Sequence, residues 1–245
     1  MASRVRADDR LVVLGLASSR EEAARLVLAG LVLEGTRRID KAGEAVGADA
    51  ALAVRERSRF VSRGGDKLDP ALERFGIDVR GAVCLDAGCS TGGFTDCLLQ
   101  RGASRVYAVD VGYGQFAWSL RSDPRVVLME RTNIRRVDAA ALDPRPTVIV
   151  ADLSFVSLGS ILPSLVLLAA APRADFVLLV KPQFEVAAAE TERGIVVSQE
   201  IRSRAIAKVD AAVRRCGLSV AATVESSIRG AEGNVEYLMH ATFSV

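Results

Sequence analysis

The chain has 245 residues, half of them apolar, and a formal net charge of only +2 at pH 7. This small charge excludes a strong sequence-independent attraction to nucleic acid, so any RNA contact must come from a local basic surface. The most apolar region, residues 161–180, is interrupted by two prolines, an arginine and an aspartate, and does not predict a membrane span.

The sequence also argues against secretion and against metal binding. Residues 1–10 are polar and lack the apolar segment of a secretory signal, so we expect a cytoplasmic protein without a membrane partner. Four cysteines occur without C-x-x-C spacing and the only histidine is His240, so no metal site is expected. Nothing in the sequence indicates the oligomeric state.

Residues 1–60 are expected to form a small α+β unit. Ser18 and Ser19 each stand three residues before a glutamate, a capping-box pattern that starts a helix, and Gly30 is suited to end it. Such a unit is either a nucleic-acid-binding module or a structural cap. The predicted elements are helices over 10–16 and 21–29 and strands at 31–33 and 51–54.

A basic segment, residues 55–63, joins this unit to the rest of the chain. Four arginines, among them Arg59 and Arg63, flank the aromatic Phe60. The segment could contact RNA directly. Alternatively, residues 57–62 form a solvated linker and Phe60 packs into the core.

From residue 63 onward, helical and strand patterns alternate, which predicts an α/β fold with a doubly wound, mainly parallel sheet. The last strand is expected to insert antiparallel to its neighbours. The seven predicted strands are 82–86, 105–110, 126–130, 147–152, 175–181, 219–225 and 235–243.

A glycine-rich turn follows the first of these strands. The spacing Asp-x-Gly-x-Ser-x-Gly begins at Asp86, and it is neither a dinucleotide fingerprint nor a phosphate-binding loop. Gly88, Gly92 and Gly93 permit positive φ and let a ligand approach the main chain. Asp110 ends the next strand, where a carboxylate commonly accepts ribose hydroxyls. The turn is therefore expected to hold a nucleoside-bearing cofactor, although a purely structural turn remains an alternative.

Four further polar residues are predicted at the edge of the sheet that carries this turn. Asp152 and Lys181 end parallel strands, Glu236 lies near the start of the antiparallel last strand, and Lys67 is expected to open a helix that leads into the domain. Only four of the 32 basic residues are lysines, and a lysine can lose its proton at lower cost than an arginine. The alternative without a function is that these residues are ordinary polar termini exposed to solvent.

The order of the motifs resembles the TlyA family of rRNA cytidine 2′-O-methyltransferases. In that family an alpha-L RNA-binding motif precedes an FtsJ-like domain with a class I, Rossmann-like seven-stranded sheet. The resemblance implies an alpha-L domain over 1–60 and a methyltransferase domain over 63–245. The segments that carry it are 61–68, 85–95, 109–115, 151–155, 180–185 and 233–237.

The resemblance implies a catalytic tetrad of Lys67, Asp152, Lys181 and Glu236, with Lys181 as base. Two effects on the base oppose each other, because nearby positive charge lowers a lysine pKa and the carboxylates raise it. Alignment of the reactants could supply much of the rate instead. The implied cofactor is S-adenosylmethionine. Its expected binding residues are Asp86, Gly88, Ser90, Thr91, Gly92, Gly93, Phe94, Asp110 and Asn133.

The expected partner is ribosomal RNA. Tyr113 and Phe155 could stack on an extruded base or be ordinary core residues. The chain ends directly after the last predicted strand, and the resemblance implies activity on the large subunit, because short members of the family are associated with large-subunit rRNA. The expected RNA-binding residues are Arg4, Arg20, Arg25, Arg37, Arg38, Arg59, Phe60 and Arg63.

Three other functions compete with this interpretation. A ribosome-assembly factor could keep the fold without activity, and a titration with the cofactor would distinguish it. A membrane-active hemolysin finds no support in the sequence, which has no membrane span and no long basic amphipathic stretch. A small-molecule methyltransferase would leave the N-terminal unit unexplained.

Overall fold

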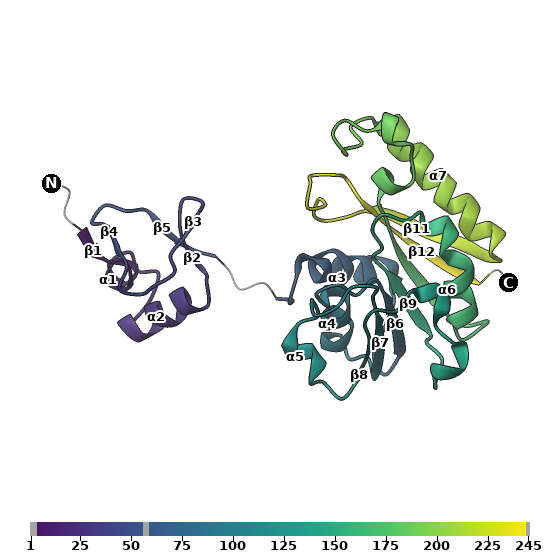
Figure 1. Ribbon diagram of the computed structural model, residues 1–245, viewed down its shortest axis with the longest axis horizontal. Coiled ribbons are helices and arrows are strands. Elements are labelled where there is room, and N and C mark those ends of the chain that lie inside the picture. The colour runs from purple at the N-terminus through teal and green to yellow at the C-terminus, as the bar shows by residue number, and fades with distance from the viewer. Residues whose placement is uncertain (1–3, 56–58, 244–245) are drawn as a thin grey trace. The chain divides into compact units, whose positions relative to one another are not determined.

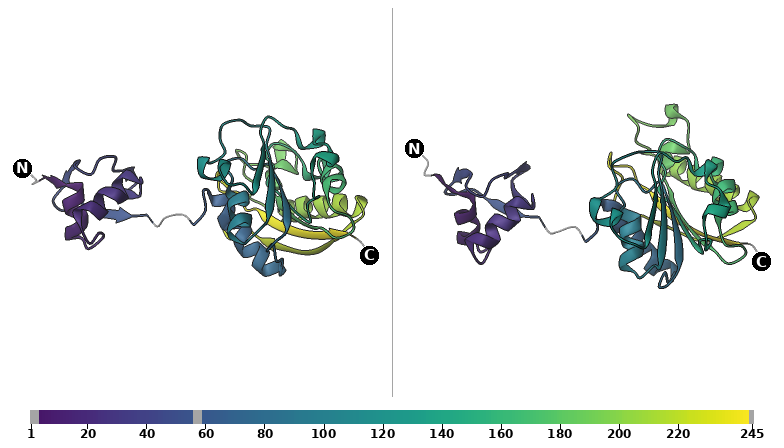
Figure 2. Two further views of the ribbon diagram at one scale, coloured as in Figure 1. Left: turned by 90° about the horizontal axis from the view of Figure 1, so that it is seen from below. Right: turned by 60° about the horizontal axis from the view of Figure 1, so that its bottom comes forward.

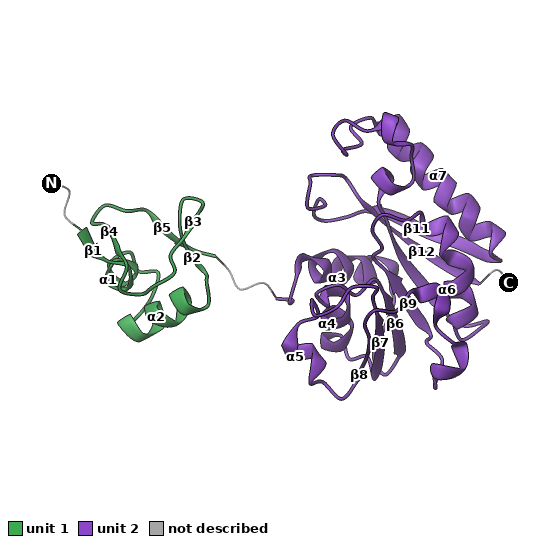
Figure 3. Ribbon diagram, in the orientation of Figure 1, with its two compact units in different colours: residues 1–58 green, residues 59–245 purple. Residues whose placement is uncertain are grey.

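The computed structural model describes residues 4–55 and 59–243 and divides the chain into two compact units, Met1–Ser58 and Arg59–Val245 (Figure 3). The expected linker at about 57–62 lies partly outside the described residues. Residues 59–62 belong to the second unit. Each unit has its own apolar core.

The first unit is a small α+β structure. Its core holds Leu11 of the first helix, Val27 of the second and Val32 of a strand, all almost completely buried. Two antiparallel sheets are present, one of two strands, β1–β4, and one of three strands in the order β3–β2–β5. The elements are β1 Arg4–Arg6, α1 Ala7–Val13, α2 Arg20–Leu28, β2 Val32–Glu34, β3 Arg37–Arg38, β4 Ala45–Gly47 and β5 Leu52–Val54.

Side chains at the helix ends determine where the two helices of this unit begin and end. Helix α1 begins three residues earlier than the apolar pattern predicted, because Asp8 and Asp9 occupy its first turn, where carboxylates favour a helix N-terminus. The start of α2 is confirmed: the hydroxyl of Ser19 accepts the backbone N–H of Glu22 at 3.2 Å. Gly30 follows α2 with a φ of +69° and ends it.

The second unit contains a seven-stranded sheet, as predicted, in the order β11–β12–β10–β9–β6–β7–β8 (Figure 1). Pairings among β10, β9, β6, β7 and β8 are parallel, and β12 runs antiparallel to both β10 and β11. Every expected strand is present, with bounds shifted by one or two residues. They are β6 Val83–Ala87, β7 Arg105–Val109, β8 Val126–Met129, β9 Val148–Ala151, β10 Asp175–Val180, β11 Leu218–Glu225 and β12 Tyr237–Phe243.

Helices cover both faces of this sheet (Figure 2). Alternate residues of each strand point to opposite faces, so Leu85 and Tyr107 pack in one core cluster while Cys84 and Val106 pack in the other. Helices α3, α4 and α5 contribute to the second cluster, and α6 and α7 to the first. Their bounds are α3 Arg63–Phe75, α4 Gly93–Gln100, α5 Trp118–Arg121, α6 Leu162–Leu168 and α7 Gln199–Arg215.

The sheet brings the expected polar residues to one edge. Val180 pairs with Tyr237 at the end of the β10–β12 ladder, so Lys181 and Glu236 follow directly at the same edge. Asp152 lies one residue beyond β9 at that edge. Short 3₁₀ helices connect the strands here: η1 Ile134–Arg136, η2 Ala139–Ala141, η3 Leu158–Ser160, η4 Pro182–Phe184 and η5 Ala188–Glu190.

Candidate cofactor and catalytic site

The glycine turn between β6 and α4 lies directly against neighbouring elements. Gly88 has a φ of +86°, and a Cβ placed there would overlap the carbonyl oxygen of Asp152. Gly92 has a φ of +96°, and its Cβ would lie 2.5 Å from Cδ1 of Leu120. Only glycine fits both the backbone conformation and the space. The turn therefore keeps its main chain in contact with the end of β9.

Asp110 connects this turn to the loop after β7. One of its carboxylate oxygens accepts the backbone N–H of Ser90 at 2.8 Å, and the other accepts that of Gly112 at 2.6 Å. Each oxygen keeps a further lone pair for a ligand hydroxyl. Asp110 thus fixes the two loops to each other. It also lines a cavity, as a carboxylate that accepts the hydroxyls of a bound ribose must.

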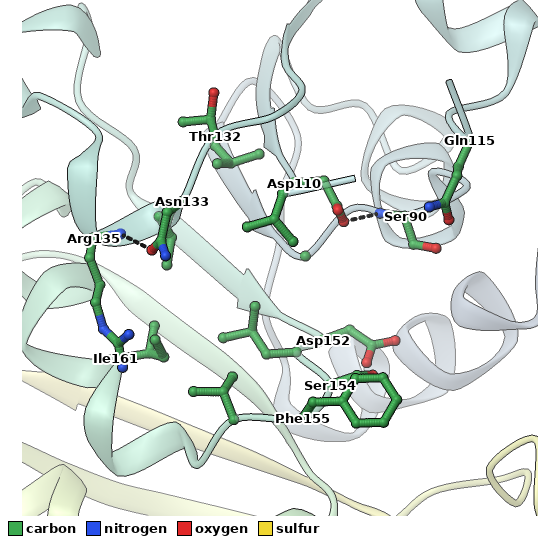
Figure 4. A pocket seen from close by; sticks show the side chains of 16 residues that line it. Ser90, Asp110, Gln115, Thr132, Asn133, Arg135, Asp152, Ser154, Phe155 and Ile161 are labelled. Atoms are coloured by element: carbon green, nitrogen blue, oxygen red, sulfur yellow. Dashed lines mark hydrogen bonds between the residues drawn. The ribbon is translucent and has the colours of Figure 1, made fainter. Parts of the chain in front are cut away.

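A cavity of about 480 Å³ opens beside these loops (Figure 4). Asp110 lies on one side of it, and Asp152, Ser154 and Phe155 lie on another. A smaller cavity of about 90 Å³ shares Gly88, Ser90 and Asp152 with it. The smaller one is also lined by Ser62, Gly64, Cys89, Thr91, Gly93 and Phe94. The expected cofactor residues from Gly88 to Phe94, apart from Gly92, therefore line two adjoining cavities.

Asn133, expected near an adenine edge, also lines the larger cavity. Its side-chain oxygen accepts the backbone N–H of Arg135 at 3.0 Å and so caps η1. The side chain is exposed, and its amide nitrogen has no hydrogen bond among the described residues. An amide held in this way can still donate to a ring nitrogen of a ligand.

Asp86 is the one completely buried carboxylate in this region of the described chain. Thr95 donates its hydroxyl to one oxygen at 2.7 Å, whereas the other oxygen, Oδ1, has no hydrogen-bond partner. Burial raises the pKa of Asp86 to about 7; the Thr95 hydrogen bond opposes this rise, and the charges of Asp152 and Asp110 add to it. An unpartnered buried carboxylate of this kind fits a ligand that carries a positive group.

Lys181 and Asp152 form the first of two ion pairs at the strand ends. Lys181 Nζ lies 2.6 Å from an oxygen of Asp152 and donates to the hydroxyl of Ser154 at 2.9 Å. The side chains are 11% and 23% exposed, so the pair can be reached from the cavity that Asp152 lines.

Lys67 and Glu236 form the second ion pair, which is more deeply buried. Their atoms approach to 2.6 Å, and their side chains are 8% and 3% exposed. Gly230 packs so closely that a Cβ there would lie 2.5 Å from the Glu236 carboxylate. Lys67 does not open a helix as expected, since α3 begins four residues earlier at Arg63. It projects from the second turn of α3 instead.

At the start of the second unit, Phe60 is 4% exposed and packs against Gly65 of α3, where any Cβ would overlap its ring. Of the two interpretations left open, the structure supports packing in the core. The expectation that Phe60 contacts RNA is therefore wrong, because its ring is not accessible. Arg59 is exposed and pairs with Asp69 at 2.5 Å. Arg63 is exposed and donates to the carbonyl of Arg229 at 3.1 Å.

All five arginines singled out in the first unit are exposed. Arg20 pairs with Asp9 at 2.6 Å and Arg38 with Asp40 at 2.7 Å. Arg37 pairs with two glutamates, Glu34 and Glu44. Neighbouring acids therefore reduce the net positive charge of this surface. The exposed arginines are Arg4, Arg20, Arg25, Arg37 and Arg38.

The aromatic residues near the cavity are exposed, so the core interpretation of Tyr113 and Phe155 is wrong. Tyr113 is 65% exposed and lies under the guanidinium of Arg131, whose carbon is 3.9 Å from the ring centre. Phe155 is 92% exposed and its ring centre lies 5.2 Å from that of Phe184. The sequence analysis did not include Ser154, which binds Lys181. Its position two residues after Asp152, at the same strand end, could have indicated it.

The comparisons with known proteins cover both units. The model of the FtsJ-like methyltransferase family matches residues 60–243, and the S4 domain model matches residues 5–51. The chain is 47% identical over 242 residues to the 16S/23S rRNA (cytidine-2′-O)-methyltransferase TlyA of Mycobacterium tuberculosis, covering 98% of this chain and 90% of the relative. It is 36% identical over 183 residues to the 23S rRNA (cytidine-2′-O)-methyltransferase TlyA of Campylobacter jejuni, covering 74% and 70%.

Solved structures agree with this grouping. A Streptococcus thermophilus protein described as a hemolysin is 40% identical, with a TM-score of 0.76 over 100% of this chain and 90% of that chain. Magnesium protoporphyrin IX methyltransferase from Synechocystis, solved with bound SAH, is only 16% identical, with a TM-score of 0.55 over 78% and 89%, and shows the fold alone. No helix in the described ranges has the length and apolarity to cross a membrane. The chain therefore belongs to the TlyA family of rRNA cytidine 2′-O-methyltransferases, with an S4 domain followed by an FtsJ-like methyltransferase domain.

Proposed function

We propose that this chain transfers a methyl group from S-adenosylmethionine to the ribose 2′-hydroxyl of a cytidine in ribosomal RNA. Its membership of the family supports the reaction class. The observation that carries the proposal is that Asp152 lines the cavity beside the glycine turn and also pairs with Lys181. One carboxylate thus joins the candidate cofactor site to the candidate base.

Residues that line the cavity, together with the completely buried Asp86, which does not line it, suit this cofactor. The cofactor supplies a methyl group bound to a positively charged sulfur. The unpartnered oxygen of Asp86 would balance its positive amino group, Asp110 would accept the ribose hydroxyls, and Asn133 would contact the adenine edge. The main chain of the turn would lie close to the methionine part, since only glycine fits at Gly88 and Gly92.

Lys181 is the proposed base. A ribose hydroxyl is a poor acid, so its oxygen attacks best when a neighbouring group takes its proton as the new bond to carbon forms. Lys181 Nζ is held by Asp152 at 2.6 Å and by Ser154 at 2.9 Å, which fixes its position beside two residues that line the cavity. The ribose oxygen would form its bond to the methyl carbon as the bond between that carbon and sulfur breaks, and the ribose proton would pass to the neutral form of Nζ.

Lys67 and Glu236 are proposed to position the hydroxyl and the base. Their ion pair is almost fully buried, so its geometry is rigid and it does not exchange readily with solvent. Glu236 lies beside Lys181 because Tyr237 and Val180, their neighbours in the chain, are paired in the sheet. Alignment of this kind contributes to rate without any proton transfer by the pair itself.

The S4 domain and the exposed rim of the cavity are proposed to bind the RNA. Tyr113 and Phe155 would stack on the extruded cytosine, because an enzyme that acts on structured RNA must expose its target. The proposed phosphate contacts are Arg4, Arg20, Arg25, Arg37, Arg38, Arg59 and Arg63.

We further propose that the large-subunit rRNA is a substrate and that the enzyme acts in the cytoplasm, where ribosomal subunits assemble. The names of both relatives include 23S rRNA, and only one of them also includes 16S rRNA. The large subunit is therefore the target that the two names share.

Transfer of labelled methyl groups to purified 50S subunits, 30S subunits and free rRNA tests this function. We expect label in 50S rRNA with the wild type and none with Lys181→Met. Arg215→Met is the matched control, because Arg215 ends α7 next to the start of β11, at the sheet edge opposite the site. If a folded wild type binds the cofactor and labels no substrate, the assembly-factor alternative holds instead.

A further inference from the structure

A buried carboxylate outside the proposed tetrad connects the two loops that carry Lys181 and Asp152. Glu185 follows η4, four residues after Lys181, and its side chain is 2% exposed. One carboxylate oxygen accepts the hydroxyl of Ser157 at 2.6 Å and the other accepts the backbone N–H of Leu158 at 2.8 Å. The loop after β10 is therefore tied to the loop after β9.

A lysine of α7 completes the arrangement. Lys208 Nζ donates to the backbone carbonyl of Glu185 at 2.5 Å and lies 3.6 Å from the Glu185 carboxylate. A buried charge needs such compensation, and here it comes from two hydrogen bonds and one cation. The loop after β9 also rests directly on α7, since a Cβ on Gly159 would lie 3.2 Å from Cβ of Ala212. Both loops are thus fixed to the same helix.

The tied segment is short and has a strained turn. Phe155 has a φ of +62°, which a residue with a large side chain rarely adopts. Such a conformation persists only when the surrounding contacts hold it. Two residues farther on, Ser157 and then Leu158 bind Glu185. One residue earlier, Ser154 accepts the hydrogen bond of Lys181. The contacts that fix this turn therefore also fix Ser154, a hydrogen-bond partner of the proposed base Lys181.

We propose that Glu185 is a positioning residue that sets the distance and orientation between Lys181 and Asp152 and keeps Phe155 projecting from the turn. This inference rests on the assignment of Lys181 and Asp152 made above. A carboxylate is required because it accepts two hydrogen bonds at once, from the hydroxyl of Ser157 and from the backbone N–H of Leu158. The backbone N–H cannot be removed by a side-chain substitution. An amide offers one acceptor oxygen and would keep only part of this geometry.

Steady-state methyl transfer to 50S subunits, combined with cofactor titration, tests the proposal on the full chain. For Glu185→Ala we expect kcat to fall by about 100-fold, because small misplacement of reacting groups has effects of this size. We expect the Kd for S-adenosylhomocysteine to change much less than kcat, by no more than about tenfold. The hydrogen bonds of the Glu185 carboxylate and carbonyl go to Ser157, Leu158 and Lys208 and not to the proposed cofactor contacts, although the loop that Glu185 holds forms one wall of the cavity. Glu185→Gln should recover kcat in part, to within about tenfold of the wild type.

Ser157→Ala and Glu190→Ala complete the design. Ser157→Ala removes one of the two hydrogen bonds without exposing a buried charge, so it tests the proposal even if Glu185→Ala does not fold. We expect kcat to fall for Ser157→Ala with the Kd retained. Glu190→Ala is the matched control, because the Glu190 carboxylate binds Arg204 and the backbone of Ala187 and has no hydrogen bond with Lys181 or Ser157. We expect its kcat to equal that of the wild type.

The outcomes separate this inference from the proposed function. An inactive wild type would contradict the proposed function. An active wild type with unchanged kcat in folded Glu185→Gln and Ser157→Ala would overturn the positioning role alone. A parallel loss of kcat and of cofactor affinity would also overturn it, because it would show general damage to the fold.

Discussion

The pKa of Asp86 predicts how the stability of the protein without cofactor depends on pH. The carboxyl is completely buried, and its pKa is raised from 3.8 to about 7. A raised pKa means that the native state holds this proton more tightly than the unfolded chain does. Stability is therefore lost as the pH rises from the unfolded value to the native value, and the loss levels off above about pH 7. Asp86→Asn removes this titration and should stabilise the protein.

The magnitude follows from the two pKa values. Relative to a neutral side chain, Asp86 costs about 2 kcal/mol of unfolding free energy at pH 5.5 and about 4 kcal/mol at pH 8. The gain in stability from Asp86→Asn should therefore be larger at pH 8 by about 2 kcal/mol. Comparing the variant with the wild type at each pH cancels the titration of all other groups.

Urea denaturation at pH 5.5 and pH 8, without cofactor, measures this difference. Asp123→Asn is the control, because Arg125 lowers the pKa of Asp123 and that carboxyl stays charged at both pH values. Its effect on stability should be equal at the two pH values. The reasoning is refuted if the gain from Asp86→Asn is also equal at both, since Asp86 would then titrate as an ordinary carboxyl.

Three further predictions address the site. Gly88→Ala should weaken cofactor binding in a calorimetric titration by at least about tenfold, because its Cβ would overlap the carbonyl oxygen of Asp152 at positive φ; an unchanged Kd would contradict this account of the turn. Phe155→Ala should leave the unfolding free energy within about 0.5 kcal/mol of the wild type, as its ring is 92% exposed. The same variant should raise the KM for 50S subunits by about tenfold through the lost stacking, and an unchanged KM would argue against that contact. Glu236→Gln should cost about 3–5 kcal/mol in urea denaturation because Lys67 is left buried and unpaired. Adding Lys67→Met should restore part of this loss, and a cost for the double variant equal to the sum of the costs of the two single variants would show that the pair is not coupled.

The sheet could be predicted from the sequence because its parallel strands are buried on both faces. Such strands, among them β6, β9 and β10, are nearly continuous apolar runs, and all seven strands of the sheet were found with errors of one or two residues at their ends. Strands β1, β3 and β4 of the first unit were missed. They are only two or three residues long, and Arg37–Arg38 is exposed, so none of them has a hydrophobic period to detect.

The residues of the candidate site could be predicted where the topology of the sheet alone determines where they lie. Carboxyl ends of parallel strands meet at one edge of a sheet, and this rule is sufficient to predict that Asp152 and Lys181 lie together. The sequence left open whether Phe60 is buried, because its burial depends on Gly65 offering space on the facing side of α3. The role of Glu185 was also hidden, since its partner Ser157 lies 28 residues away along the chain.

The most direct test of the central claim is to identify the methylated nucleoside. After reaction of 50S subunits with the enzyme and S-adenosylmethionine, the 23S rRNA would be digested to nucleosides and analysed by mass spectrometry. The account predicts 2′-O-methylcytidine with the wild type and its absence with Lys181→Met. Methyl groups on the cytosine ring, or 2′-O-methylcytidine formed equally by Lys181→Met, would contradict the proposed roles of this site.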